Sequence, residues 1–330
     1  MKSIFHHKPV NGPFEDPTVF VRILRDRRAL LLDVGNVSFL SPRDLMKITD
    51  VFVTHMHMDH FIGFDAIVRT LLRRNSPLTF YGPEGIIDRI QGKLSGYTWN
   101  IISEYPLVIN VLEIREAKVH KAKFEASNRF EFNDEGTCSN AGRVLDNILF
   151  SVDAVVLEHD VPSLGFSVKE KIHINIDKAR LTERGFNVGP WLNTLKDAIR
   201  DSNFNETIDT CKGRYQISDL KDIYMITEGQ KLSYIMDSSP TENNFNKIAK
   251  FVAGSDVLYI EAHFIHEDVE HARSRNHLTA RLSGLIAKKA GVKNLRLLHF
   301  SPRYTERSKD IINEAYMAFT QPGPERFTDF

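Results

Sequence analysis

Short runs of apolar residues recur along the whole chain, and the spacing between them changes twice. In the first third, strand-like runs alternate with segments of helical periodicity. From about residue 107 to residue 170, strand-like runs follow one another directly. The last third alternates again. This order predicts an α/β protein in which helices cover the outside of two stacked sheets.

The boundaries of the expected elements follow from these runs. Strands are expected at 19–24, 29–33, 51–54, 78–81, 107–114, 119–124, 144–150, 154–158, 165–169, 231–236, 256–261 and 294–300. Helical periodicity covers 60–74, where Phe61, Phe64 and Ile67 fall on one face. Pro83 stands where another helix would begin, because proline favours the first helical position.

One segment, residues 170–209, departs from this alternation. It is polar and helix-forming, with helices expected at 177–184 and 191–200 and a turn that contains Gly189 and Pro190. The pattern predicts a helix-turn-helix arm that projects from a single domain spanning residues 1–330. A surface excursion without function explains these residues equally well.

Composition and charge narrow the class of protein. The chain has 330 residues, of which 42% are apolar and 26% charged, as in ordinary globular proteins. Its 43 basic and 43 acidic residues cancel, so any nucleic-acid binding must come from local patches. Neither a signal peptide nor a membrane-spanning run is recognisable, and we expect a cytoplasmic protein with no membrane contact. Cys138 and Cys211 lie in polar surroundings outside any CxxC pair, which argues against a disulfide or a thiolate metal site.

The densest group of candidate metal ligands lies between residues 55 and 60. It comprises His55, His57, Asp59 and His60. Imidazole nitrogen and carboxylate oxygen are donors that zinc and related divalent ions accept. Residues i and i+2 point the same way only in extended chain, so His55 and His57 must leave the end of a strand. The cluster is therefore predicted to sit at a strand-loop-helix junction.

Three further donors stand at the ends of later apolar strands. His159 follows strand 154–158, Asp237 follows strand 231–236, and His299 follows the run 295–298. Functional loops gather at such strand ends in parallel and mixed sheets. Seven donors are too many for one tetrahedral ion and suit two, and a carboxylate can bridge such a pair.

With these motifs in view, the chain resembles the metallo-β-lactamase superfamily. His55-x-His57-x-Asp59-His60 is similar to the signature of that superfamily. The runs Leu157 to Phe166 and Leu297 to Tyr304 resemble two ligand motifs of its ribonuclease Z branch, the endoribonucleases that process tRNA 3′ ends. The similarity extends over about residues 16–320.

The resemblance implies an αββα sandwich of two mixed sheets and a centre of two divalent metal ions. Zinc is the family's usual metal, and manganese is an alternative. One ion would be held by His55, His57 and His159, the other by Asp59, His60 and His299, with Asp237 between them. Asp33 would orient ligand histidines. Asp59, Glu261 and His277 would act in catalysis, the last two as a proton shuttle to the leaving oxygen. Ser301 and Arg303 are weaker candidates for phosphate contact.

The function implied by the resemblance is removal of the 3′ trailer of precursor tRNA, by in-line attack of metal-bound hydroxide. Related enzymes are generally homodimers. They also carry an arm with a Gly-Pro element that grips the tRNA elbow, and Gly189-Pro190 lies in the matching place. The arm here is nearly neutral, although phosphate binding is driven by Lys and Arg.

Three departures from the family pattern bear on the substrate. Gly63-Phe64-Asp65 replaces the usual Gly-Leu-Pro, Val34 to Val37 replaces an acidic loop, and Ile260 and His263 alter a His-Glu-Ala-Thr element. They leave all seven predicted ligands in place. Together with the near-neutral arm, they support an alternative, a phosphodiesterase or related hydrolase acting on a small molecule, with the arm as a lid or dimer contact. A nucleic-acid-binding protein without catalysis would require a missing ligand, and none is missing.

Overall fold

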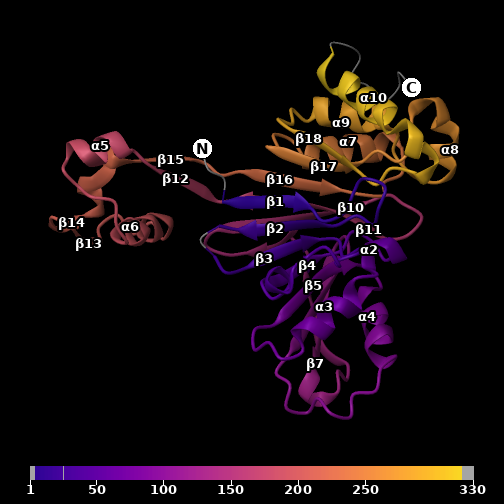
Figure 1. Cartoon of the computed structure of the whole chain (residues 1–330), viewed down its shortest axis with the longest axis horizontal. Coiled ribbons are helices and arrows are strands. Elements are labelled where there is room, and N and C mark those ends of the chain that lie inside the picture. The colour runs from indigo at the N-terminus through magenta and orange to yellow at the C-terminus, as the bar shows by residue number, and fades with distance from the viewer. Residues whose placement is uncertain (1–3, 25, 322–330) are drawn as a thin grey trace.

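Two β-sheets packed face to face form the centre of the molecule, and helices cover the outer face of each (Figure 1). The computed structural model describes residues 4–24 and 26–321. The first sheet has eight strands, in spatial order β1-β2-β3-β4-β5-β6-β7-β8. They are β1 (Phe5–Pro9), β2 (Val19–Ile23), β3 (Ala29–Leu32), β4 (Ile48–Phe52), β5 (Leu78–Pro83), β6 (Val108–Ile114), β7 (Lys118–Glu125) and β8 (Asn133–Ser139).

The second sheet has six strands, in the order β18-β17-β16-β11-β10-β9. They are β9 (Arg143–Asp146), β10 (Phe150–Leu157), β11 (Ser163–Glu170), β16 (Lys231–Ile235), β17 (Val257–Glu261) and β18 (Leu295–Leu298). Both sheets are mixed, with parallel pairing along β3-β4-β5-β6 in the first and β16-β17-β18 in the second.

Helices pack on both outer faces. On the first sheet lie α1 (Pro42–Leu45), α2 (Met58–Phe61), α3 (Phe64–Leu71) and α4 (Ile86–Ser95); beside the second lie α7 (Glu242–Phe251), α8 (Val269–Ser274), α9 (Ala280–Lys289) and α10 (Ser308–Thr320). Short 3-10 helices span Ala126–Asn128, Ile217–Ile223, His266–Asp268 and Pro302–Arg307. Among the described residues, no helix is both long and apolar enough to cross a membrane.

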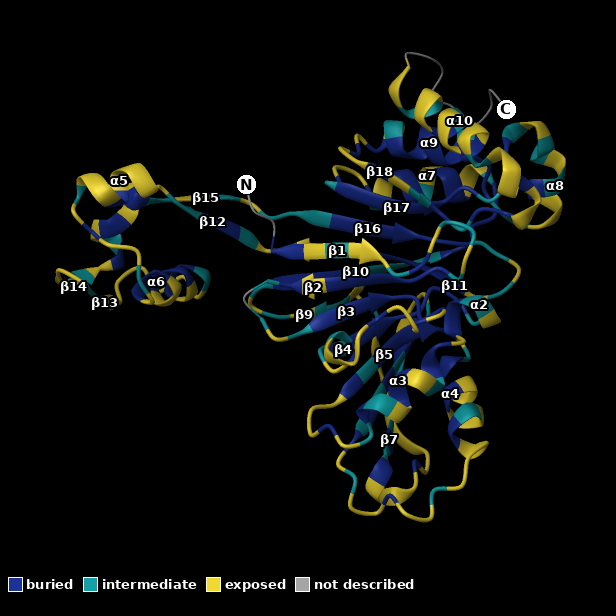
Figure 2. Ribbon diagram, in the orientation of Figure 1, coloured by how far each residue is buried: buried dark blue, intermediate teal, exposed yellow. Residues whose placement is uncertain are grey.

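The side chains of strand β3 show how this layering is encoded. Leu30 and Leu32 point into the apolar core between the two sheets, whereas Ala29 and Leu31 point into the core beneath α3 and α4. All four residues are completely buried, as expected of a strand that is covered on both faces. The buried strands and the exposed helix surfaces are plain in Figure 2. The metallo-β-lactamase-type sandwich expected from the sequence is the fold observed.

Three sequence-based boundaries were wrong, and the helix expected at 60–74 is the first. It is broken into α2 and α3 at Gly63, because Gly63 packs against the backbone of the loop after β3. Pro83 ends β5 rather than starting a helix, and α4 begins at Ile86 after Gly85, whose φ is 89°. The single strand expected at 144–150 is instead the end of β9, a turn at residues 147–149 and the first residue of β10. The edge strands β1 and β8 were not expected, because their residues are largely polar and exposed.

The arm is longer than the 170–209 segment expected from the sequence. It leaves the body through β12 (Ile172–Ile176) and returns through the antiparallel β15 (Tyr224–Glu228). Between them lie α5 (Lys178–Glu183), α6 (Trp191–Arg200), β13 (Thr207–Thr210) and β14 (Gly213–Gln216). A separate apolar core that includes Leu181, Trp191 and Ile217 holds the arm together. The sequence did not predict the returning strand, because its partner lies about 50 residues away in the chain. The arm projects away from the two sheets (Figure 1).

Candidate metal centre

The seven predicted metal ligands meet at one edge of the two sheets. His55 and His57 follow β4, Asp59 and His60 lie on α2, and His159, Asp237 and His299 follow β10, β16 and β18. Three of the described residues at the site have a left-handed backbone conformation. They are Asp33 (φ 56°), Asp237 (φ 41°) and His299 (φ 58°). Non-glycine residues adopt this conformation at a cost of about 1–2 kcal/mol, and such residues gather at functional sites.

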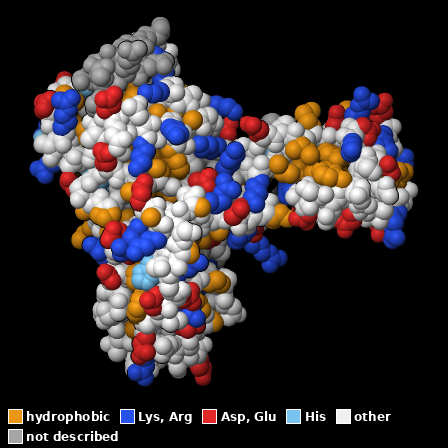
Figure 3. All heavy atoms as spheres, turned by 180° about the vertical axis from the view of Figure 1, so that it is seen from behind, with side chains coloured by type: hydrophobic (Ala, Val, Ile, Leu, Met, Phe, Trp, Pro, Cys, Tyr) orange, Lys and Arg blue, Asp and Glu red, His pale blue; other side chains and the backbone are white. Residues whose placement is uncertain are grey.

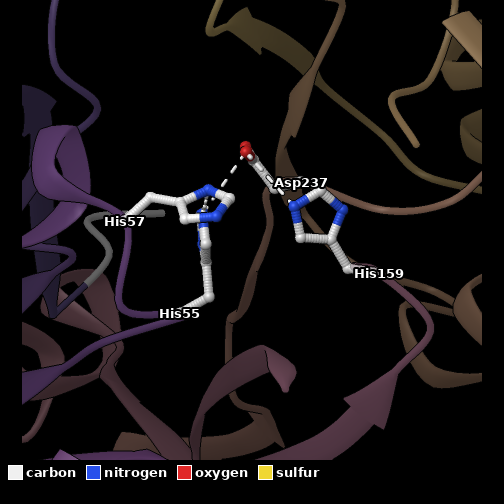
Figure 4. Close-up of side chains that lie close together, drawn as sticks. All are labelled: His55, His57, His159 and Asp237. Atoms are coloured by element: carbon white, nitrogen blue, oxygen red, sulfur yellow. Dashed lines mark hydrogen bonds and ion pairs between the residues drawn. The ribbon is translucent and has the colours of Figure 1, made fainter. Parts of the chain in front are cut away.

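Asp237 stands between two groups of side chains. Its Oδ2 lies 3.4 Å from His55 Nε2 and 3.9 Å from His159 Nε2. Its Oδ1 lies 2.8 Å from His299 Nδ1 and 3.5 Å from His60 Nε2. Figure 4 shows the imidazoles of His55, His57 and His159 turned toward this carboxylate. One carboxylate therefore presents a separate oxygen to each group.

The remaining ligand candidates complete these two groups. His57 Nδ1 lies 2.9 Å from His55 Nε2, and donor atoms of His55, His57, His159 and Asp237 lie within 4.8 Å of one another. Asp59 Oδ2 lies 3.2 Å from His299 Nε2 and 3.4 Å from His60 Nε2. The grouping of these donors agrees with the two sets expected from the sequence, and their binding of metal stays a prediction.

Buried atoms without hydrogen bonds show that the donors fit cations. In the described part of the chain, His60 Nε2, His159 Nε2, Asp237 Oδ1 and His299 Nδ1 are buried and have no hydrogen-bond partner. An unsatisfied buried polar atom costs about 1–3 kcal/mol. Three of these atoms belong to the group around Asp237 Oδ1 and the fourth, His159 Nε2, to the group around Oδ2. Divalent cations bound at the two groups would satisfy them, since such ions accept nitrogen and oxygen donors.

The charge states of the histidines agree with this interpretation. Burial lowers the pKa of His55 and His57, which keeps these imidazoles neutral, as metal ligands must be. Burial would also lower the pKa of His299, but Asp237 and Asp59 raise it to about 10. A cation between these groups would take the place of that proton, so loading of metal is expected to release protons.

Hydrogen bonds on the far side of the imidazoles of His60 and His159 fix the orientation of these two rings. Asp33 is fully buried and accepts hydrogen bonds from Thr54 N (2.6 Å) and Tyr234 OH (2.9 Å), while its Oδ2 lies 2.8 Å from His60 Nδ1. His60 therefore turns Nε2 toward the site. His159 Nδ1 donates to the carbonyl oxygen of Asn276 at 3.1 Å and likewise leaves Nε2 free. The sequence indicated Asp33, but it held no signal for Thr54, Tyr234 or Asn276.

An acid-base pair adjoins the ligands. Glu261, at the end of β17, is fully buried, and its Oε1 accepts a hydrogen bond of 2.6 Å from Ser238 N. Its Oε2 lies 2.8 Å from His277 Nδ1, which is itself 3.9 Å from Asp237 Oδ2. Burial alone would lower the pKa of His277, but the Glu261 carboxylate raises it above its ordinary value. This imidazole can therefore carry a proton beside the ligand cluster.

With this geometry established, comparison with known proteins identifies the family. Ribonuclease Z of Deinococcus radiodurans is 32% identical to this chain over 296 residues, which cover 88% of each protein. The chain belongs to the ribonuclease Z family. No protein-family model matches it.

Two solved structures share the fold of this ribonuclease Z family member. The short form of human tRNase Z has a TM-score of 0.52 at 21% identity and covers 91% of this chain and 92% of its own. The metallo-β-lactamase fold protein YhfI of Bacillus subtilis has a TM-score of 0.56 at 15% identity, and the match covers 95% of this chain and 92% of YhfI. The architecture is therefore the metallo-β-lactamase fold.

Two of the three segments that depart from the ribonuclease Z pattern, at Gly63 and at Val34, are neighbours in space. Gly63 N donates to Val34 O at 2.9 Å, and a Cβ on Gly63 would stand 2.2 Å from Gly35 O. His263, where the family element has Thr, stacks on His277 with ring centroids 4.0 Å apart and planes at 11°. Its Nδ1 donates to His299 O at 3.0 Å. His263 thus joins a ligand loop to the acid-base pair, a role that its sequence neighbours did not indicate.

Ser301 and Arg303, the weaker phosphate candidates, lie farther out than the ligands. Together with His277 they line a pocket of about 340 Å³. Ser301 is nearly buried, whereas Arg303 is exposed and its Nη1 lies 3.5 Å from Asp268 Oδ2.

Proposed function

We propose that this protein is a metal-dependent endoribonuclease that removes the 3′ trailer of precursor tRNA. The observation that carries the proposal is the position of Asp237, which faces one donor group with each oxygen while His277 stands 3.9 Å away. Such an arrangement suits hydrolysis of a phosphodiester, in which negative charge develops on phosphate oxygens and a leaving oxygen needs a proton. The relationship to ribonuclease Z of Deinococcus radiodurans supports RNA as the substrate.

The cofactor we propose is a pair of zinc ions, with manganese as the alternative. The donor set of five imidazoles and two carboxylates favours zinc over magnesium or calcium, which prefer oxygen. Two divalent cations in such a site lower the pKa of water and neutralise charge on the phosphate. His55, His57 and His159 would hold one ion and Asp59, His60 and His299 the other, with Asp237 shared.

The protein's own groups would position the ligand imidazoles and protonate the leaving oxygen. Asp33 and Asn276 hold the imidazoles of His60 and His159 in the orientation that ligation needs. Glu261 keeps a proton on His277 and fixes its ring, so His277 can donate a proton to the 3′ oxygen that leaves. Ser301 and Arg303 line the rim from which a phosphate would approach.

A second candidate, hydrolysis of a small phosphodiester, is favoured by one observation. The arginines of the arm are engaged in ion pairs within the arm and are poorly available to RNA phosphates. These pairs are Arg180–Glu183, Arg184–Asp222, Arg200–Asp197 and Arg214–Asp209. Figure 3 likewise shows positive and negative side chains interspersed on the visible face of the arm. Tight RNA binding normally requires cations that are free to displace counterions.

The decisive experiment is cleavage of a 3′-extended precursor tRNA by the purified protein with zinc or manganese. We expect a tRNA product that ends in a 3′-hydroxyl next to the discriminator base. Asp237→Ala should lose bound metal, measured by elemental analysis, together with activity. Turnover of a small phosphodiester without any cleavage of precursor tRNA would favour the second candidate. A homodimer and a cytoplasmic location stay predictions, and light scattering in solution tests the first.

A further inference from the structure

A pocket of about 340 Å³ opens beside His277. Its walls come from two segments, residues 263–277 after β17 and residues 301–303 after β18. A volume at the lower end of the range for small-ligand sites suits one nucleoside and no larger part of an RNA. The pocket is therefore a candidate for one nucleotide of the substrate.

Two guanidinium groups at this pocket are available to an anion. Arg275 is exposed and makes no side-chain ion pair or hydrogen bond within the described residues. Arg303 has a single long contact, 3.5 Å from Asp268, and Asp268 also accepts a hydrogen bond from Tyr304 OH. Guanidinium groups bind phosphate through paired N–H donors. A phosphate at the rim could therefore be held from both segments.

Imidazole and phenyl rings line the interior of the pocket. His263 and His277 stack with centroids 4.0 Å apart, and His271 meets Phe264 edge to face at 5.0 Å and 87°. Phe264 is buried, so His271 presents the more accessible ring of this second pair. Flat rings of this kind stack on nucleobases with little preference for sequence. One base and one phosphate thus find matching groups in the same pocket.

We infer that this pocket binds the nucleoside that carries the leaving 3′ oxygen, with its own 5′ phosphate on Arg275 and Arg303. The inference rests on the proposed function. In that hydrolysis an oxygen from water bonds to phosphorus, the bond from phosphorus to the 3′ oxygen breaks, and the proton of His277 passes to that oxygen. The nucleoside that leaves must therefore lie on the side of His277, and this pocket is lined by His277.

The test measures binding of a short RNA that ends in a 3′-hydroxyl, the product end of the reaction, by fluorescence anisotropy with the metal-loaded protein. Arg275→Ala and Arg303→Ala are each expected to weaken binding about tenfold, the effect of losing one charge-assisted contact to phosphate. Arg307→Ala is the matched control, because Arg307 is exposed on the same segment but paired with Glu267 and Asp310. Equal affinity for all three variants would overturn the inference.

An abasic series locates the base. Removing the 3′-terminal base of the RNA should weaken binding to the wild-type protein about tenfold but change binding to His271→Ala much less. Removing the second base from the end should weaken both proteins alike. Coupling of His271 to the second base, or to neither, contradicts the assignment. Because no cleavage is needed, a protein that fails to cut precursor tRNA but shows these differences would disprove the proposed function and leave the pocket assignment standing.

Discussion

At the scale of single residues, three buried carboxylates each contact more than one group. Asp33 joins Thr54 and His60, Asp237 faces both donor groups, and Glu261 joins Ser238 N to His277. A buried carboxylate is costly unless its oxygens are satisfied. Each of these groups is therefore held in one position, and that position decides the direction of an imidazole.

The pair of Glu261 and His277 leads to a prediction about pH. Since Glu261 raises the pKa of His277, the acid form persists to higher pH and activity falls as pH rises through that pKa. Glu261→Gln should lower this pKa and move the alkaline limb of kcat to lower pH, with metal content unchanged. His277→Ala should keep its metal and lose about 10²- to 10⁴-fold in kcat. If the alkaline limb of kcat in Glu261→Gln stays at the wild-type pH, Glu261 does not set the pKa of His277.

Asn276 offers a second prediction at this scale. Its φ is 55°, its carbonyl accepts from His159, and its side chain bonds Ser239 and Asp160. Glycine adopts this backbone freely, whereas alanine is strained by about 1–2 kcal/mol. Asn276→Ala should therefore lower the melting temperature and metal affinity more than Asn276→Gly does, although alanine keeps more side chain. Equal losses in the two variants would show that the side-chain amide, which both variants lack, rather than the backbone conformation positions His159.

At the scale of elements, the site depends on how α2 and α3 meet. The break at Gly63 lets α2 present Asp59 and His60 to the site while α3 packs Phe64 and Ile67 into the core. The backbone hydrogen bond from Gly63 to Val34 fixes the angle between the two helices. The ligand cluster is thus joined to the loop after β3.

Two glycine substitutions test this junction. A Cβ at Gly63 would stand 2.2 Å from Gly35 O, so Gly63→Ala should force α2 away and destabilise the fold by about 2 kcal/mol or more. At Gly92, within α4, a Cβ would meet nothing within 4 Å. Gly92→Ala should stabilise by about 0.5–1 kcal/mol, because alanine favours helices. Chemical denaturation and zinc titration measure both effects. Equal stability in the two variants would contradict the close contact.

At the scale of the whole molecule, the arm and the metal centre occupy opposite ends of the same strands. Strand β11 starts at Ser163, which bonds to the carbonyl of Asp237, and its eight residues lead to the base of the arm. That length corresponds to about 26 Å. Any contact that the arm makes with substrate would therefore lie far from the metal centre, and we expect its role to be separable from the chemistry.

Removal of the arm tests that separation. Ile176 pairs with Tyr224, so an Asn-Gly turn can replace residues 177–223 and close the β12–β15 hairpin. The body keeps its own cores. We expect KM for precursor tRNA to rise about 10²-fold, while turnover of bis(p-nitrophenyl) phosphate survives. Because the arginines of the arm are internally paired, the salt dependence of tRNA binding should change by less than about one unit of slope. A large fall in slope would show that these pairs open on binding.

The sequence by itself determined the candidate donors, the strands that carry them and the family. Those features depend on local alternation and on motifs of a few residues, which neighbouring positions reveal. Only the tertiary structure decided which oxygen of Asp237 faces which group, and that Tyr234 and Asn276 bond to Asp33 and His159, which lie 201 and 117 positions away. It also decided the split at Gly63 and the full length of the arm. These outcomes depend on contacts between distant segments, which no local pattern of residues encodes.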